Sequence, residues 1–147
     1  MNWLIGELVK WEKVTVNEIK ELKVYIKALK FSNMIWDICN KWDKFAKFSI
    51  GIQLVKAADS ISANIAEGYG RYHFKENLHF CYIARGSMEE SFDWLRKSNT
   101  RKLLNNQQKA EIDDFVKTFP KEFNGYIKYI KQSMLKNPNS TSSTKKS

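Results

Sequence analysis

Apolar residues recur every three or four positions along most of the chain, which is the period of an amphipathic helix. The first helix is predicted to begin near Asn17, a candidate N-cap that Glu18 follows in the first turn. Polar residues and Gly51 end this pattern, so we expect a turn at about 46–51. The apolar stripe of this helix comprises Val24, Ala28, Phe31, Ile35, Ile38, Trp42 and Phe45.

A second helix is predicted over about 50–68, with many small residues that allow neighbouring helices to approach closely. We expect Gly68 to end it as a left-handed C-cap. Its apolar face comprises Ile50, Leu54, Ala58, Ile61 and Ile65.

A third helix over about 74–98 carries the clearest heptad pattern, but Arg85 stands in the middle of its apolar seam. Gly86 and Ser87 follow this arginine directly. The seam comprises Phe74, Leu78, Cys81, Arg85, Met88, Phe92 and Leu95.

The fourth helix is predicted over about 107–135, with a kink near 116–120 because Pro120 removes one backbone hydrogen bond. Its apolar stripe comprises Ile112, Val116, Phe119, Phe123, Tyr126 and Ile130.

Together these patterns predict an all-α protein, an antiparallel up-and-down four-helix bundle over residues 17–135. Residues 1–16 form an N-terminal extension in which Trp3, Leu4, Leu8 and Trp11 suit a short extra helix, and residues 136–147 are predicted to be a disordered basic tail. The predicted core comprises Ala28, Phe31, Ile35, Trp42, Leu54, Ala58, Ile61, Ile65, Leu78, Cys81, Phe92, Leu95, Phe119 and Phe123.

The length of 147 residues suits one domain, and the net charge of +9 favours polyanions as partners. Three of these charges lie in residues 136–147, so the remainder carries +6, mostly on lysines interspersed with acids. An ordinary solvated surface rich in lysine is an equally good interpretation of this charge.

Composition also indicates the environment of the chain. Cys39 and Cys81 are far apart and fall on apolar seams, so we expect reduced core thiols and neither a disulfide nor a zinc site. The N-terminus lacks the pattern of a signal peptide, and no run reaches the roughly 20 apolar residues of a membrane span. We therefore expect a cytoplasmic protein.

Candidate catalytic groups are few. His73 and His79 are the only histidines and point to different faces of a helix, and no metal-binding, nucleophile-elbow or phosphate-loop motif occurs. The glycines of EGYGR follow a helix, so a helix end explains them better than a phosphate loop. We predict that the protein is not an enzyme and binds no cofactor or metal.

Arg85 is the most informative polar residue, because a core-facing arginine needs acidic partners. Glu67 is the first candidate and Glu89 the second, with Asp59 a further possibility. With Asn64 they suggest a polar cluster that fixes helix register or a subunit contact. The alternative is that Arg85 extends its aliphatic stem to the surface.

A second polar feature is the basic and aromatic patch at the loop after the second helix, formed by Arg71 and Lys75 with Tyr69 and Tyr72. Such a patch suits a phosphate or a stacked base. The alternative is a solvated helix end.

Residues 53–95 resemble the four-helix-bundle family of proteins encoded by intervening sequences in bacterial 23S rRNA genes. The resemblance rests on two separated motifs in the family's order, and a weaker similarity runs from Leu22 to Leu135. Lys56 stands where arginine is common in the family. The matching residues are Lys56 to Ala58, Ser60, Asn64 to Gly68, Arg71, Ala84 to Ser87 and Glu90.

The resemblance implies a four-helix bundle that assembles into a homopentameric ring. One branch, the accessory variability determinant of diversity-generating retroelements, binds a reverse transcriptase and nucleic acid through a basic surface. We therefore expect a non-catalytic ring protein that binds RNA or DNA, and the alternative is a scaffold or accessory subunit for a protein partner. The residues assigned to nucleic acid are Lys56, Arg71, Lys75, Lys145 and Lys146.

Overall fold

The structure is a computed structural model that describes Ile19 and residues 22–136. The described part is all-helical, and no strand occurs within it. The elements are α3 (Lys23–Asn40), α4 (Lys44–Ala46), the π-helical turn η2 (Lys47–Gly51), α5 (Ile52–Gly70), α6 (Phe74–Thr100) and α7 (Asn106–Lys136).

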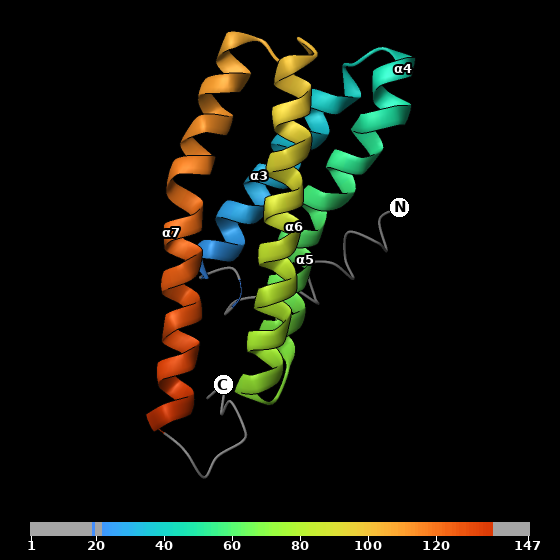
Figure 1. Cartoon of the computed structure of the whole chain (residues 1–147). Coiled ribbons are helices and arrows are strands. Elements are labelled where there is room, and N and C mark those ends of the chain that lie inside the picture. The colour runs from blue at the N-terminus through green and yellow to red at the C-terminus, as the bar shows by residue number, and fades with distance from the viewer. Residues whose placement is uncertain (1–18, 20–21, 137–147) are drawn as a thin grey trace, which may run out of the picture.

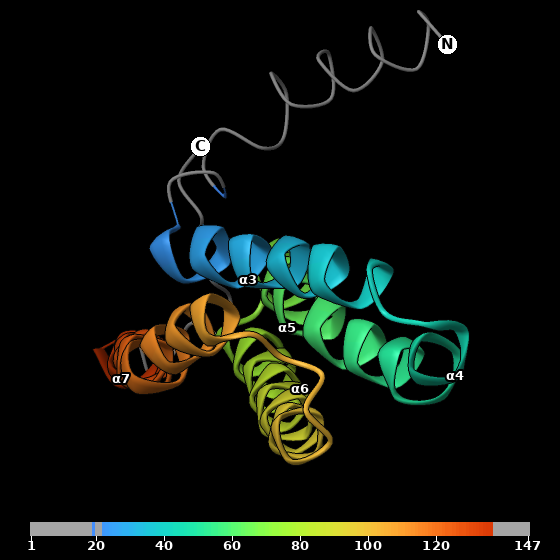
Figure 2. The same ribbon diagram turned by 90° about the horizontal axis from the view of Figure 1, so that it is seen from above.

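Figure 1 shows the four long helices side by side, with the α5–α6 turn at one end of the molecule and the α6–α7 connection at the other. Viewed from above, α3 lies across α5, whereas α6 and α7 lie beneath and beside it (Figure 2). α5 packs against both α3 and α6, and α7 packs against α6 and α3. The core lies where these helices meet.

The first turn lies at residues 41–43, so the prediction of a turn at 46–51 was wrong. Asp43 caps the next helix, since its side chain accepts a hydrogen bond from the Ala46 N–H at 2.9 Å. Gly51 is buried inside the helix, where an added Cβ would lie 3.3 Å from the Ala46 carbonyl oxygen and 3.5 Å from the Trp42 ring. The close approach of the preceding turn therefore favours glycine here, although the chain does not turn.

Gly68 also differs from the prediction of a left-handed C-cap. Its φ is not positive, and α5 continues to Gly70. A Cβ at Gly68 would lie 2.7 Å from Asn77 Oδ1 and 2.8 Å from Phe80 Cβ. The absence of a side chain therefore allows α5 and α6 to approach closely.

The predicted core is confirmed, with Trp42 and Leu78 partly buried against its edge. Trp42 Nε1 donates to the Leu103 carbonyl at 3.1 Å and so ties the first turn to the α6–α7 connection. The core contains a column of aromatic rings from α3 and α7. Phe31 stacks on Phe115 with ring centroids 3.9 Å apart, and Phe115 stacks on Phe119 at 4.6 Å.

The helical predictions for α6 and α7 are confirmed within two residues at each end. α7 runs as one helix through Pro120. Its buried face includes Phe115 and Ile127, whereas Val116 of the predicted stripe is exposed.

Candidate nucleic-acid interface

Arg85 lies on the exposed face of α6, so its predicted place in the core seam was wrong. The buried face of α6 runs through Cys81, Ala84 and Met88. An apolar seam along a helix can advance by three or by four residues. The prediction took the four-residue step from Cys81 to Arg85, whereas the structure takes the three-residue step to Ala84, whose small side chain is fully buried. The Arg85 guanidinium instead lies over the Tyr82 ring, 5.0 Å from its centroid.

The other members of the predicted polar cluster do not gather around Arg85. Glu67 forms an ion pair with Arg71 at 2.7 Å, and the Asn64 side-chain amide donates to the Ser60 carbonyl within α5. Glu89 is exposed on α6. Among the described residues, no ion pair joins Arg85 to an acid, so the predicted Arg85–Glu67 pair is absent there.

Among the predicted basic residues, Lys56 lies on α5, Arg71 directly after it and Lys75 at the start of α6. Arg71 lies over the Phe80 ring at 4.8 Å, and Lys75 is exposed close by at the start of α6. Lys56 is exposed on α5 fifteen residues before Arg71, which separates them by about 22 Å along a helix. Lys145 and Lys146 lie outside the described residues.

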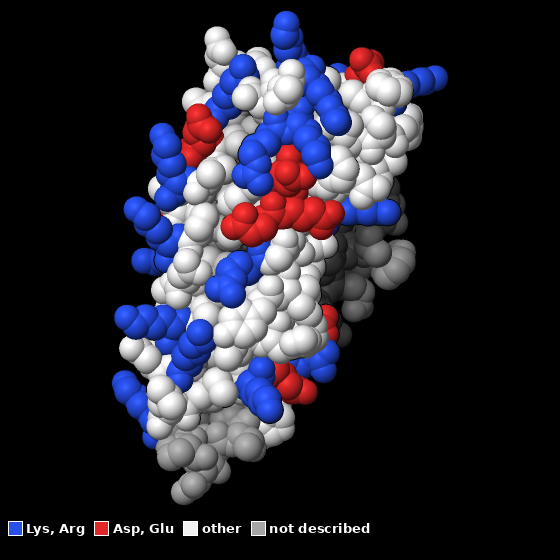
Figure 3. All heavy atoms as spheres, viewed as in Figure 1, with Lys and Arg blue, Asp and Glu red and all other residues white. Residues whose placement is uncertain are grey.

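A row of lysines that the sequence interpretation overlooked runs along the exposed side of α7. Lys117, Lys121, Lys128 and Lys131, here called the lysine row, are all exposed. Their spacings of four, seven and three residues place them on one face, over about 21 Å of helix. Figure 3 shows basic side chains gathered along the edge of the molecule that α7 forms. The spacing alone was a sufficient signal for this face.

On α7, the acids near the lysine row are Glu122 within it and Asp113 and Asp114 one turn before Lys117. Glu122 is the only acid between Lys117 and Lys136, and its carboxylate accepts from Lys27 Nζ at 2.9 Å. Within the described residues, no acid forms an ion pair with a member of the row. The row is therefore a line of solvated cations whose charge is available to an anionic partner.

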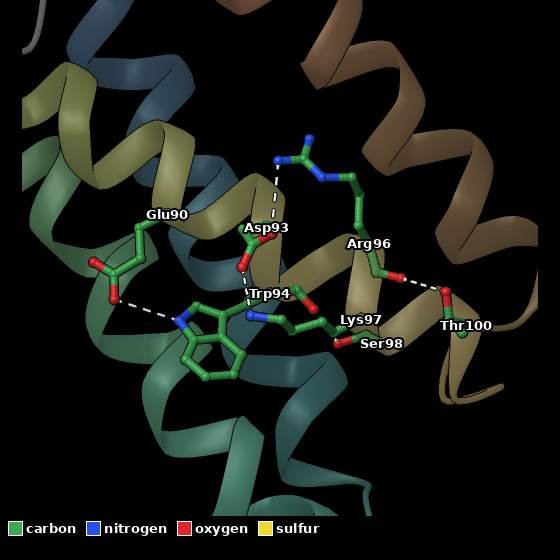
Figure 4. Close-up of polar contacts among 7 residues, drawn as sticks. All are labelled: Glu90, Asp93, Trp94, Arg96, Lys97, Ser98 and Thr100. Atoms are coloured by element: carbon green, nitrogen blue, oxygen red, sulfur yellow. Dashed lines mark hydrogen bonds and ion pairs between the residues drawn. The ribbon is translucent and has the colours of Figure 1, made fainter.

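The end of α6 shows the contrasting arrangement (Figure 4). Asp93 accepts from Lys97 Nζ at 2.5 Å and lies 3.9 Å from the Arg96 guanidinium. The hydrogen bond from Lys97, with the charges of Lys97 and Arg96, lowers the pKa of the Asp93 carboxyl. Trp94 lies beneath the Lys97 ammonium at 4.5 Å and its indole N–H faces Glu90. The cations here are partly neutralised by acids of their own helix.

Tyr82 connects the lysine row to α6. Its ring lies 5.6 Å from Lys131 Nζ and 5.0 Å from the Arg85 guanidinium carbon. Such cation–π contacts hold both charged groups without neutralising them. Arg85, a residue of the neighbouring helix α6, is thus an additional cation beside the row.

The described residues contain no group of three side chains suited to a metal ion. No described helix is long and apolar enough to cross a membrane. A family model described as 23S rRNA-intervening sequence protein matches residues 20–125, which include α3, α5, α6 and most of α7. No curated protein matches the chain.

Proposed function

Because the chain belongs to the 23S rRNA-intervening sequence protein family, we propose that it is a non-catalytic protein that binds RNA or DNA through the lysine row. The observation that supports this proposal is the alignment of four exposed lysines without acidic partners among the described residues. Arg85 adds a fifth cation from α6.

The row suits contact with phosphates. Lysine ammonium groups bind phosphate oxygens as point charges, without reading base sequence. A row about 21 Å long spans several phosphates of either a duplex or a single strand. We therefore expect affinity that depends strongly on salt and weakly on sequence.

We further propose that the helices form an antiparallel up-and-down bundle and that five copies assemble into a ring, as the family resemblance implies. A ring presents the lysine row five times. Several rows on one assembly increase the avidity for a long nucleic acid without any new contact in the single chain.

The test is fluorescence anisotropy with a labelled RNA and a labelled DNA at several salt concentrations. Four phosphate contacts predict a slope of log K against log salt of about −3.6 for duplex DNA, so affinity falls on the order of 100-fold between about 50 and 200 mM salt. Replacing Lys117, Lys121, Lys128 and Lys131 by Gln should abolish most of this salt dependence.

The matched control replaces the exposed residues Lys30, Lys41, Lys44 and Lys102 by Gln, which removes the same charge from outside the row. We expect this control to lose less than one third of the binding free energy that the lysine-row variant loses. Equal loss in both variants would contradict a localised interface and show that only net charge matters.

The second candidate function is a scaffold or accessory subunit for a protein partner, for example a reverse transcriptase. It is favoured by the large apolar side chains that remain exposed on α3 and around η2, such as Trp36 at 58% and Phe48 at 65%. Binding to nucleic acid that does not change with salt or with the lysine-row variant would favour this function.

A further inference from the structure

An apolar groove lies between α3 on one side and η2 with the start of α5 on the other. Its volume is about 360 Å³, and Trp36, Phe48, Ile52 and Val55 supply most of its apolar lining. Trp36, Phe48 and Ile52 are 58%, 65% and 40% exposed. A groove lined by large exposed apolar side chains is typical of a binding surface.

The backbone at the groove is also unusual. The Ile52 N–H bonds to the Lys47 carbonyl across five residues, the pattern of a π-helical turn. Such turns are rare and occur frequently at functional sites. The charged residues that line the groove are Lys47 and Lys56, so an occupant that is apolar and carries an acidic residue is favoured.

We propose that the groove binds residues 3–11 of the same chain. In this segment Leu4, Leu8 and Trp11 recur at helical spacing. Glu7 is complementary in charge to Lys47 and Lys56, and with Lys10 it leaves residues 3–11 without net charge. The family match begins at residue 20, after this segment.

The chain before α3 allows this placement. Ile19 is buried, and its carbonyl accepts the Leu22 N–H at 3.0 Å, which forms a tight turn just before α3. Trp36 lies thirteen residues after Lys23, about 20 Å along the helix. The eleven residues from Leu8 to Ile19 span only about 16 Å if fully helical but about 36 Å if extended, so Leu8 can reach the groove when part of this stretch is extended.

The test uses the full-length chain with Leu8→Cys, labelled with a benzophenone maleimide and irradiated, and cross-linked sites are mapped by mass spectrometry. The native thiols of Cys39 and Cys81 react slowly with maleimide because burial raises the pKa of each to about 12. We expect cross-links to residues 36–56. The control is Lys10→Cys, which helical spacing would place away from Leu4, Leu8 and Trp11, and it should give at least fivefold fewer cross-links.

Mixing chains labelled with ¹⁴N and ¹⁵N identifies the source of the segment. Cross-links within one chain support the proposal. Cross-links that join the two isotopes would show a second copy in the groove and overturn it, as would cross-links that avoid residues 36–56.

Two substitutions give an independent measurement. Leu8→Ser in the unlabelled chain should raise the fluorescence of a hydrophobic dye at least threefold, whereas Lys10→Ser should leave it unchanged. Ile52→Ser should lower the cross-linking yield at least fivefold, and Tyr129→Ser, an exposed residue of α7, should not. Equal dye fluorescence for Leu8→Ser and Lys10→Ser, or equal cross-linking yields for Ile52→Ser and Tyr129→Ser, would overturn the proposal.

Discussion

At the residue scale, Arg85 shows how one helical step decides the chemistry of a side chain. Ala84 occupies the buried position beside Cys81 and Met88, which leaves the guanidinium on the exposed face over Tyr82. An arginine there requires no acidic partner, because water and the ring satisfy its charge. It therefore contributes to surface charge rather than to the core.

Arg85→Met tests this assignment. The substitution removes an exposed cation and keeps the stem, so we expect the free energy of unfolding to change by less than about 0.5 kcal/mol. Urea unfolding followed by circular dichroism measures the change. A loss of about 3–5 kcal/mol would instead indicate a buried ion pair.

The two thiols give a second prediction at this scale. Burial raises the pKa of Cys39 and of Cys81 to about 12, whereas an unfolded thiol ionises near about 8.5. Stability is therefore fully present below about pH 8.5 and falls as the pH rises toward 12, by up to about 1.4 kcal/mol per pH unit for each thiol.

Urea titrations at pH 8, 9 and 10 check this dependence. In Cys81→Ala, the part of the fall in unfolding free energy with pH that the thiols cause should be about halved. The substitution should also lower the free energy of unfolding at every pH. A slope unchanged by this variant would contradict the assignment to the thiols.

At the element scale, the contact between α5 and α6 depends on Gly68. A Cβ there meets Asn77, which is buried, and the Cβ of Phe80, which moves only with its backbone. The two helices must therefore separate to accommodate any side chain. Gly125 of α7 is the opposite case, since nothing lies within 4 Å of its added Cβ.

We predict opposite signs for alanine at these two glycines. Gly68→Ala should lower the free energy of unfolding by about 1–3 kcal/mol through overpacking. Gly125→Ala should raise it by about 0.5–1 kcal/mol, because alanine is the better helix former. Thermal and urea unfolding of both variants measure the difference. If Gly68→Ala instead stabilised the protein, α6 would have to shift away from α5 more easily than its contacts indicate.

Sequence patterns predicted the long helices well, because each carries an apolar face over several turns. They failed at glycines, because glycine occurs both in turns and where two helices pack closely. Gly51 and Gly68 suggested turns but serve close packing, and nothing local distinguishes these roles before the neighbouring helix is known. The lysine row was predictable from its spacing, whereas the position of Tyr82 between Arg85 and Lys131 depends on how α6 meets α7.

At the scale of the whole molecule, the lysine row and the apolar groove lie on different elements. The lysine row lies on α7, and the exposed aromatic side chains of the groove, Trp36 and Phe48, lie on α3 and η2. Binding of a polyanion and contact with an apolar partner can therefore occur together. Variants of one surface should leave the other unchanged, which makes the two proposals separable by experiment.

The stacking of Phe31 on Phe115 has a consequence for how fast the chain folds and unfolds. Most helix contacts join neighbours along the chain, a topology of low contact order that favours folding within milliseconds. The Phe31–Phe115 pair spans 84 residues, so closing it costs more chain entropy than the local contacts do. We expect α7 to dock on α3 after the transition state. Phe115→Leu should then speed unfolding and leave the folding rate nearly constant in stopped-flow measurements, whereas a slower folding rate would place this pair in the folding nucleus.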